Sequence, residues 1–440
     1  MTGMILSADI GTSSLKAAYI DFEGRLIAFG RELYGKDVQG FGTYKWEKAF
    51  ANVLENLHEQ LPGRIIDAVI FSGNGPTLTP ITKDNEALSP LFWYDCKTRA
   101  KNEADSFFLP HVAWFKENTP EQYNKTRLFL SPHEWLSYKL GAKAMAALPS
   151  KIYEPYYWND EQCRLYDLDR ARFPPFIEMG KPVGRVSAEA ASFLGPYCGN
   201  CLKSGVPIIA GGPDFISALI GTGTMKVGDV CDRAGSSEGI NVCAPAPVNG
   251  EDYKVLSSAG LRALPHAKEG LWNIGAVIPI SGRLFDQYRI ESGQQEREYG
   301  ELLEELIPST FPIPHSALNK GQAVLCAMAY TVHQALDTLG AAGFTVREMK
   351  VSGGQGKNPF WNQLKADITG VTLMLPEITD GELAGNAVLA AAALGAASSV
   401  EEAVGKMIRV REQYQPRNTA FWDEKYLQYL KQSHTEKGST

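Results

Sequence analysis

The sequence predicts a mixed α/β protein with two domains. Short apolar stretches of strand type end in glycine-rich polar turns, and amphipathic stretches of helical period lie between them. The N-terminal pattern also starts again near residue 205. Because 440 residues suffice for two or three ordinary domains, we expect one domain over residues 1–205 and a second over 206–440.

The first elements predict a β-hairpin followed by an α/β alternation. The apolar run 4–9 reads as a buried strand, a polar turn covers residues 11–14, and residues 15–21 resume a strand pattern. The amphipathic stretch 46–60 then predicts a helix, and residues 67–73 predict the next strand. A helix between strands is typical of α/β architecture.

The second half repeats this alternation. The strand candidate 206–210 runs into Gly211-Gly212-Pro213-Asp214 and an apolar helical stretch. Apolar residues at helical spacing from Val324 to Leu339 predict a helix that stops at Gly340. A short strand over 349–352 and a last long, Ala- and Gly-rich helix over about 382–397 complete the predicted core.

Composition excludes several classes of partner. The formal net charge of -7 disfavours nucleic acid and anionic membranes, which normally bind basic surfaces. No run of about 18 apolar residues exists, and the N-terminus lacks the pattern of a signal peptide, so we expect a cytoplasmic protein. The seven cysteines are scattered, and the pair Cys198 and Cys201 has no second ligand pair, which favours structural thiols over a zinc site.

Three glycine-rich turns each follow an apolar strand, over residues 9–14, 235–239 and 353–358. Glycine permits close backbone approach, and neighbouring hydroxyl and amide groups can donate to phosphate oxygens. Each turn alone is equally well an ordinary end of a strand. None matches the P-loop or the dinucleotide fingerprint, so the two commonest nucleotide folds are disfavoured.

Taken together, the motifs resemble those of the FGGY carbohydrate kinases, and of their xylulokinase-like branch in particular. The matching strings are D-I-G-T-S-S-L-K-A, G-G-P-D preceded by G-V-P-I, and S-G-G-x-G-K-N-P-x-W-N-Q-x-x-A-D-x-x-G ahead of an Ala/Gly helix. The resemblance is collinear from about residue 5 to 430, and its last string is the most specific.

The resemblance implies two ribonuclease-H-like domains of the actin, hexokinase and Hsp70 ATPase type, with an interdomain cleft where ATP and sugar meet. It also implies a magnesium ion, with Asp9 and Asp214 near it. Carried over residue by residue, the residues expected to face ATP are Gly11, Thr12, Ser13, Ser14, Lys16, Ser236, Gly282, Gly354, Gln355, Gly356 and Asn358. An exposed strand lysine is the plain alternative for Lys16, and a turn residue is the alternative for Asp9.

Asp214 is the expected general base. Phosphoryl transfer needs a positioned nucleophile and compensation of phosphate charge, and a carboxylate can accept the proton as the substrate oxygen attacks. Because Asp214 lies between a strand end and a helical stretch, an ordinary helix N-cap is the alternative interpretation.

Substrate selection is expected in the N-terminal domain. Residues 72–77 and 93–97 are similar to the family's S-G-Q and W-x-D-x-R segments, which implies sugar contacts from Asn74, Thr77, Trp93 and Asp95. Carboxylate and amide groups bind vicinal hydroxyls, and an aromatic ring covers the carbon face of a sugar. Either stretch could instead be loop and core, with Trp93 simply buried.

Several departures from the family bear on specificity. Residues 75–77 are Gly-Pro-Thr, which matches neither the M-H-G of xylulose kinases nor the R-E-T of glycerol kinases. Phe215 stands where Gln or Asn is common, and Lys97 stands where Arg is usual. Residues 131–135 and 139–141 also replace the usual D-Y-x-x-x-x-L-T-G. The sugar site is therefore expected to be more apolar than usual.

The sequence thus predicts an ATP-dependent kinase of a small sugar or polyol, with a pentulose such as xylulose as the first expectation. One alternative is a sensor on the same scaffold that binds sugar and nucleotide but turns over little. Another is an actin-like polymerising ATPase, which would leave the W-x-D segment unexplained. An exposed patch could support a homodimer, but no stretch of sequence establishes one.

Overall fold

The computed structural model describes residues 3–35, 42–95, 106–235, 237–247, 250–307 and 318–437, and the chain forms two compact units. Unit 1 comprises Met1–Gly221, Ala267–Glu269 and Gly381–Ile408, and unit 2 comprises Thr222–His266, Gly270–Asp380 and Arg409–Thr440. The predicted boundary after residue 205 therefore lies inside unit 1, because the next strand and helix pack with the N-terminal elements.

Unit 1 is built around a six-stranded mixed sheet of described residues in the order β3-β2-β1-β4-β10-β9. Strand β2 is antiparallel to both of its neighbours, β3 and β1. Strands β4 and β10 run parallel to β1, and β9 is antiparallel to β10. Its elements are β1 (Met4–Ile10), β2 (Ser14–Asp21), β3 (Leu26–Leu33), α1 (Tyr44–Gln60), β4 (Ala68–Gly73), β5 (Thr79–Thr82), α2 (Leu109–Asn118), α3 (Pro120–Lys125), β6 (Thr126–Leu130), α4 (Pro132–Lys139), β7 (Ala146–Leu148), η1 (Lys151–Tyr153), α5 (Glu154–Tyr157), α6 (Asp160–Leu165), η2 (Arg170–Arg172), β8 (Phe176–Glu178), β9 (Pro182–Arg185), α7 (Ala188–Cys198), β10 (Pro207–Ile209), α8 (Asp214–Gly221), α14 (Gly381–Ala393) and α15 (Val400–Met407).

The predicted hairpin, helix and strand of the N-terminal region are confirmed as β1, β2, α1 and β4. Every residue of β1 and of β4 is buried, as expected for central strands covered on both faces. Helix α1 buries one face of its amphipathic sequence, which includes Trp46, Phe50 and Leu57.

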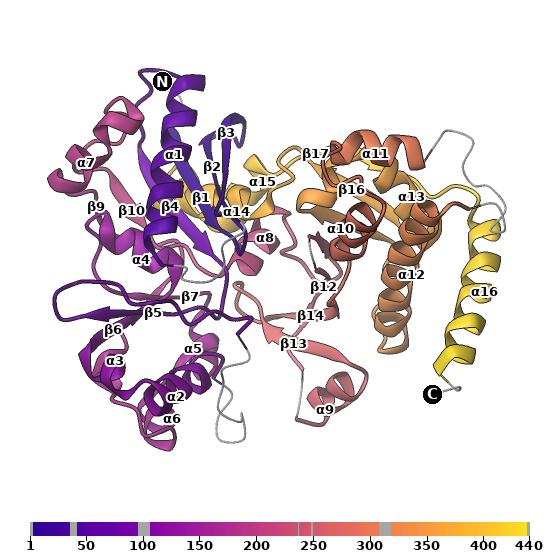
Figure 1. Ribbon diagram of the computed structural model, residues 1–440, viewed down its shortest axis with the longest axis horizontal. Coiled ribbons are helices and arrows are strands. Elements are labelled where there is room, and N and C mark those ends of the chain that lie inside the picture. The colour runs from indigo at the N-terminus through magenta and orange to yellow at the C-terminus, as the bar shows by residue number, and fades with distance from the viewer. Residues whose placement is uncertain are drawn as a thin grey trace. The chain divides into compact units, whose positions relative to one another are not determined.

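Helix α14 belongs to unit 1 although it lies more than 150 residues after the rest of that unit's sheet. In Figure 1, α14 has the orange-yellow colour of the late chain and lies beside the indigo strands of the N-terminal region. It packs on α8 with almost no side chain between the backbones: a Cβ at Gly385 would lie 1.9 Å from the Ser217 carbonyl, and one at Gly221 would lie 1.9 Å from the Gly381 carbonyl. Glycine is therefore required where α8 and α14 meet.

We expect Gly385→Ala to destabilise unit 1 by about 1–3 kcal/mol, since the methyl group must push two packed helices apart. Gly405→Ala is the matched control: it also places alanine in a helix, but a Cβ at Gly405 meets nothing within 4 Å. It should stabilise slightly, by about 0.5–1 kcal/mol. Urea unfolding of both variants checks this, and equal midpoints for the two would contradict the close packing.

Unit 2 contains, among its described residues, a seven-stranded sheet in the order β13-β14-β12-β11-β15-β16-β17. Strands β11, β15 and β16 run parallel, and the other pairs are antiparallel. Its elements are β11 (Val230–Ala234), β12 (Glu238–Pro245), α9 (Gly250–Ser258), β13 (Leu261–Pro265), β14 (Leu271–Ile278), α10 (Gly282–Glu291), α11 (Tyr299–Leu306), α12 (Lys320–Ala341), β15 (Glu348–Ser352), η4 (Gly354–Lys357), α13 (Pro359–Thr369), β16 (Thr372–Pro376), β17 (Val410–Tyr414) and α16 (Thr419–Lys437).

The central strands of the two units follow the same pattern: three antiparallel strands, then two more strands parallel to the third, then an antiparallel edge. This repetition confirms the predicted mixed α/β class. The pattern starts again at β11 and not near residue 205, because β10 belongs to the sheet of unit 1. The prediction that Gly340 ends a helix is wrong, because α12 continues to Ala341. The left-handed residue that follows the helix is Gly343, with φ of 91°, two residues beyond that end.

Candidate functional site

A buried carboxylate lies at the carboxyl end of β1. Asp9 is only 4% exposed, and its neighbours in register are Lys16 on β2 and Ser72 on β4. The Ser72 hydroxyl donates to Asp9 Oδ1 at 2.7 Å. Burial above all, followed by the negative charge of Glu382 and more weakly that of Asp214, raises the pKa of Asp9 to about 8, while Lys16 acts in the opposite direction. Such a costly carboxylate is typical of a functional site.

Asp214 occupies the first position of α8, directly after the glycines that follow β10. A Cβ at Gly211 would lie 1.8 Å from the Phe71 carbonyl, so glycine alone lets the chain pass this close to β4 before the helix begins. Asp214 is half-buried, and its Oδ1 accepts from the Phe215 backbone N–H at 2.6 Å. Ser72 lies beside Asp9 in register, and the next residue of β4, Gly73, pairs with Pro213, so the strand register brings the first residue of α8 close to Asp9 in unit 1.

The turn between β1 and β2 exposes some of its hydroxyl groups to solvent and buries another in the sheet. The Gly11 N–H donates to the Ser14 carbonyl at 3.0 Å and closes the turn. Thr12 and Ser13 are exposed, whereas Ser14 is buried and its hydroxyl accepts from Arg31 Nε at 3.1 Å. Of the predicted phosphate-facing hydroxyls, the first two are therefore open to solvent and the third is held in the sheet.

The predicted substrate residues form a hydrogen-bonded chain beside this turn. Asn74 Nδ2 donates to the Ile10 carbonyl at 2.9 Å, and Asn74 Oδ1 accepts from the Thr77 hydroxyl at 2.8 Å. Thr77 Oγ1 accepts in turn from the Trp93 backbone N–H at 3.3 Å. The Trp93 indole, whose residue is 40% exposed, donates to Thr12 Oγ1 at 3.3 Å. Asn74 and Thr77 thus hold the loops, while Trp93 presents a ring surface to solvent.

Asp95 is half-buried, and its backbone N–H donates to the Phe92 carbonyl at 3.1 Å. Cys96 and Lys97, which complete the W-x-D-x-R-like segment, lie outside the described residues. So does Ser236 in the second glycine-rich turn. Phe215, the departure beside Asp214, is half-buried.

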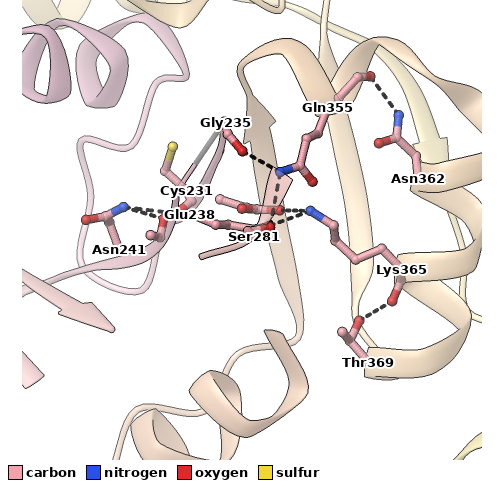
Figure 2. A network of polar contacts seen from close by, with 12 residues as sticks. Cys231, Gly235, Glu238, Asn241, Ser281, Gln355, Asn362, Lys365 and Thr369 are labelled. Atoms are coloured by element: carbon pink, nitrogen blue, oxygen red, sulfur yellow. Dashed lines mark hydrogen bonds and ion pairs between the residues drawn. The ribbon is translucent and has the colours of Figure 1, made fainter. Parts of the chain in front are cut away.

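The remaining predicted nucleotide residues gather in unit 2, where two turns and the start of α10 are linked (Figure 2). Gln355 is buried in η4, and its Nε2 donates to the Gly235 carbonyl at 2.6 Å and to the Ser281 hydroxyl at 3.1 Å. The Gly282 N–H donates to the same Gly235 carbonyl at 3.2 Å. A Cβ at Gly282 would lie 2.5 Å from that oxygen, so the contact requires glycine.

The other residues of the third turn prepare helix α13. Asn358 is its N-cap, and Asn358 Oδ1 accepts from the Trp361 N–H at 2.9 Å. The carbonyl of the buried Gly356 accepts from Asn362 Nδ2 at 2.8 Å. Gly354 is exposed, and a Cβ there would meet nothing within 4 Å. Hydrogen bonds to α13 therefore fix this turn, and the turn is exposed to solvent at Gly354.

A buried charge triad lies under these turns, and sequence reasoning missed it. Lys365 Nζ contacts Asp232 Oδ2 at 2.8 Å and Glu238 Oε1 at 2.5 Å, and all three side chains are fully buried (Figure 2). Burial lowers the pKa of Lys365, but the two carboxylates outweigh that effect and raise it to about 12. Glu238 Oε2 accepts from the Ser281 hydroxyl at 2.6 Å. The triad is thereby connected to Gln355 through Ser281.

The pKa values of the two acids in the triad are shifted in opposite directions. Burial, helped by the charge of Glu238, raises the pKa of Asp232 well above its usual value. Burial also raises the pKa of Glu238, but the positive charge of Lys365 outweighs burial and lowers this pKa below its usual value. These opposite shifts favour the charged form of Glu238 beside Lys365 and disfavour a second negative charge on Asp232, which limits the net charge that is buried.

Sequence reasoning also missed Glu382, the second residue of α14. Its Oε2 atom is buried and has no hydrogen-bond partner among the described residues. Its charge is the largest electrostatic contribution to the raised pKa of Asp9. The Ala/Gly pattern around it predicted a closely packed helix but gave no signal of a carboxylate facing β1.

Comparison with known proteins identifies the family. A model of the N-terminal domain of the FGGY family of carbohydrate kinases matches residues 98–221, and a model of the C-terminal domain matches residues 309–394. The chain belongs to the FGGY family of carbohydrate kinases. As an FGGY kinase it is an ATP-dependent enzyme that phosphorylates a sugar substrate.

Curated relatives of this FGGY chain differ in substrate. It is 23% identical to the xylulose kinase of Bacillus subtilis (strain 168), over 94% of this chain and 93% of the relative. It is also 21% identical to the autoinducer-2 kinase of Salmonella typhimurium, over 94% and 90%. The FGGY family is therefore shared along the whole chain, whereas the substrates named for its members vary.

Solved structures confirm the fold expected for an FGGY kinase. A xyloylose kinase from Brucella ovis matches with a TM-score of 0.77 and 20% identity, covering 99% of this chain and all of that one. A gluconate kinase from Lactobacillus acidophilus matches with a TM-score of 0.78 and 17% identity, covering 99% and 98%. None of the helices described for this FGGY chain has the length and apolar character to cross a membrane.

Proposed function

We propose that this kinase phosphorylates a hydroxyl of a pentulose such as xylulose and that Asp214 is its general base. The observation that carries the proposal is the pair of unlike carboxylates in unit 1. Asp9 is buried, with a pKa of about 8, whereas Asp214 is half-buried at a helix start and influences it electrostatically. Two carboxylates in such different environments are suited to different roles.

In this mechanism Asp214 accepts the proton of the sugar hydroxyl while the hydroxyl oxygen attacks the terminal phosphorus of ATP. The bond from that phosphorus to the oxygen of ADP breaks, and the phosphoryl group moves to the sugar. The Phe215 N–H donates to Oδ1 of Asp214 and thereby orients the carboxylate. The exposed Thr12 and Ser13, with Gly11 and Lys16, would bind the phosphates, and the buried Ser14 would support the turn from the sheet.

Magnesium fits the chemistry of the residues around Asp9. Among the described residues no group of three or more His, Cys, Asp or Glu side chains is placed to hold a metal ion. Mg²⁺ needs fewer protein ligands, because it keeps waters and binds substrate phosphates. Asp9 and Asp214 would hold it, and the excess negative charge from Glu382 makes a cation favourable there. When bound, the ion would neutralise phosphate charge.

We propose that the turns of unit 2 bind the rest of the nucleotide, with contacts from Ser236, Gly282, Gly354, Gln355, Gly356 and Asn358. The hydrogen bonds from Gln355 and Gly282 to the Gly235 carbonyl support this, because they hold the turns together before a ligand arrives. Nucleotide binding then costs less ordering of these turns.

For the sugar we propose direct contacts from Trp93 and Asp95, with Asn74 and Thr77 supporting them. The exposed indole of Trp93 offers a flat surface for the carbon face of a sugar. The full-length similarity to xylulose kinases favours a pentulose. Phe215 beside Asp214 makes the site more apolar, which favours a substrate with fewer hydroxyl groups there.

The test is ADP release with Mg·ATP across ketopentoses, deoxy-ketohexoses, gluconate, polyols and glycerol. We expect one ketopentose to give the highest kcat/KM. A better substrate from another class would overturn the pentulose assignment and keep the kinase. Binding of sugar and ATP by calorimetry, without turnover of any compound, would favour the sensor, which the apolar Phe215 beside Asp214 also suggests.

A further inference from the structure

A fully buried asparagine joins α14 to the site in unit 1. Asn386 Nδ2 donates to the Ala8 carbonyl of β1 and to the Ser72 hydroxyl of β4, both at 3.0 Å. Asn386 Oδ1 accepts from the Ser217 hydroxyl of α8 at 3.1 Å. Both N–H groups and the oxygen of this amide are used, so the side chain has one orientation.

Ser72 passes the effect of Asn386 on to Asp9. A serine hydroxyl has one proton to donate, and Ser72 gives it to Asp9 Oδ1 at 2.7 Å while accepting from Asn386. The asparagine thus fixes the rotation of the hydroxyl that holds the carboxylate. Ser72 and Asn386 are both 0% exposed, so no water can replace either hydrogen bond.

The relay acts on a carboxylate to which, among the described residues, the Ser72 hydroxyl donates the hydrogen bond. Asp9 also lies in register with Lys16, whose charge acts on it electrostatically. If the hydroxyl turns, burial and the charges of Glu382 and Asp214 act on a carboxylate whose orientation is no longer fixed. Positioning errors of this kind reduce the rate of phosphoryl transfer more than they reduce binding.

We propose that Asn386 is a positioning residue for the kinase reaction, acting through Ser72 on Asp9. The inference rests on the proposed function of Asp9 in phosphoryl transfer. Asn386→Ala and Ser72→Ala should each lower kcat by roughly tenfold, with KM for ATP and for the sugar changed by less than about twofold. Because both act through one hydroxyl, the double variant should lose no more than the larger single loss.

Ser7→Ala is the matched control. The Ser7 hydroxyl is equally buried and joins the same strand and helix by donating to the Leu383 carbonyl at 2.8 Å, but it does not contact Asp9. Its loss should lower the unfolding midpoint and leave kcat unchanged. A purely structural Asn386 would make Asn386→Ala behave like Ser7→Ala, with a lower unfolding midpoint and an unchanged kcat, and this outcome would overturn the proposal whatever Ser72→Ala does.

The experiment uses the whole chain and the best sugar of the panel, with thermal unfolding measured for every variant. Should Asn386→Ala not fold, Asn386→Leu removes the same donors without leaving a cavity, and the same tenfold loss is expected. Losses that multiply to about a hundredfold in the double variant would also overturn the relay. Because wild-type turnover is established first, failure of the relay is distinct from failure of the proposed function.

Discussion

Asp214→Asn is expected to lower kcat for sugar phosphorylation by a factor of about 10²–10⁴. Asparagine keeps the size of the side chain and an oxygen for the Phe215 N–H, but its amide cannot accept the proton of the attacking hydroxyl. KM for Mg·ATP should rise much less than kcat falls, because the nucleotide contacts proposed for unit 2 are untouched, Asp9 remains as a proposed magnesium ligand and asparagine keeps an oxygen at this position. Steady-state ADP release and calorimetric binding of sugar and ATP measure the two effects separately.

Asp160→Asn is the control for this prediction. Asp160 is an aspartate of unit 1 at the start of a helix, but its side chain is 83% exposed and pairs with Arg170 at the surface. It should keep the wild-type kcat. An Asp214→Asn enzyme that retains kcat within about threefold would refute the assignment of the base while leaving the family assignment intact.

Lys365→Met is expected to destabilise unit 2 by about 3–5 kcal/mol, since it leaves an ionised Glu238 buried without its cation. Methionine fills most of the volume of the lysine stem, so the loss reports charge rather than a cavity. Hydrogen exchange at increasing urea, read by mass spectrometry, follows the peptides of unit 2 separately from those of unit 1.

Two further variants test the cause of this loss. Lys365→Met combined with Glu238→Gln removes the uncompensated charge, and we expect most of the lost stability to return. Lys320→Met breaks the exposed contact with Glu291, which is equally short at 2.7 Å, and should leave the midpoint unchanged. Equal losses for Lys365→Met and Lys320→Met would mean that burial of the triad does not govern its contribution.

The sequence predicted those helices and strands whose periodicity and turn residues lie close together in the chain. The hairpin of β1 and β2, the strand before Gly211 and the helix after Asp214 have their periodicity and turn residues within a few positions. The position of Asp9 at a strand end could be predicted for the same reason. Its raised pKa could not, because that depends on Glu382, which is hundreds of residues away in the chain.

Long-range partners account for what the sequence did not reveal. Lys365 and Glu238 are separated by 127 positions, and Asn386 and Ser72 by 314. No pattern in one sequence indicates that such residues meet in a buried network. The predicted end of α12 was wrong for a different reason. Gly340 is tolerated inside the helix, and Gly343 is the glycine with positive φ that follows it. Propensity alone does not distinguish these two glycines.

The discontinuous composition of unit 1 has a consequence for how the chain acquires its structure on the ribosome. Strands β1, β4 and β10 are complete once residue 221 has been made, but the helix that covers them ends at residue 393 and the unit at residue 408. At ordinary elongation rates roughly 10 to 40 seconds pass between these points. During that time the apolar surface that α14 will bury stays uncovered, and a fragment ending at residue 221 would expose it permanently. Unit 1 can therefore complete its fold only after α14 has left the ribosome.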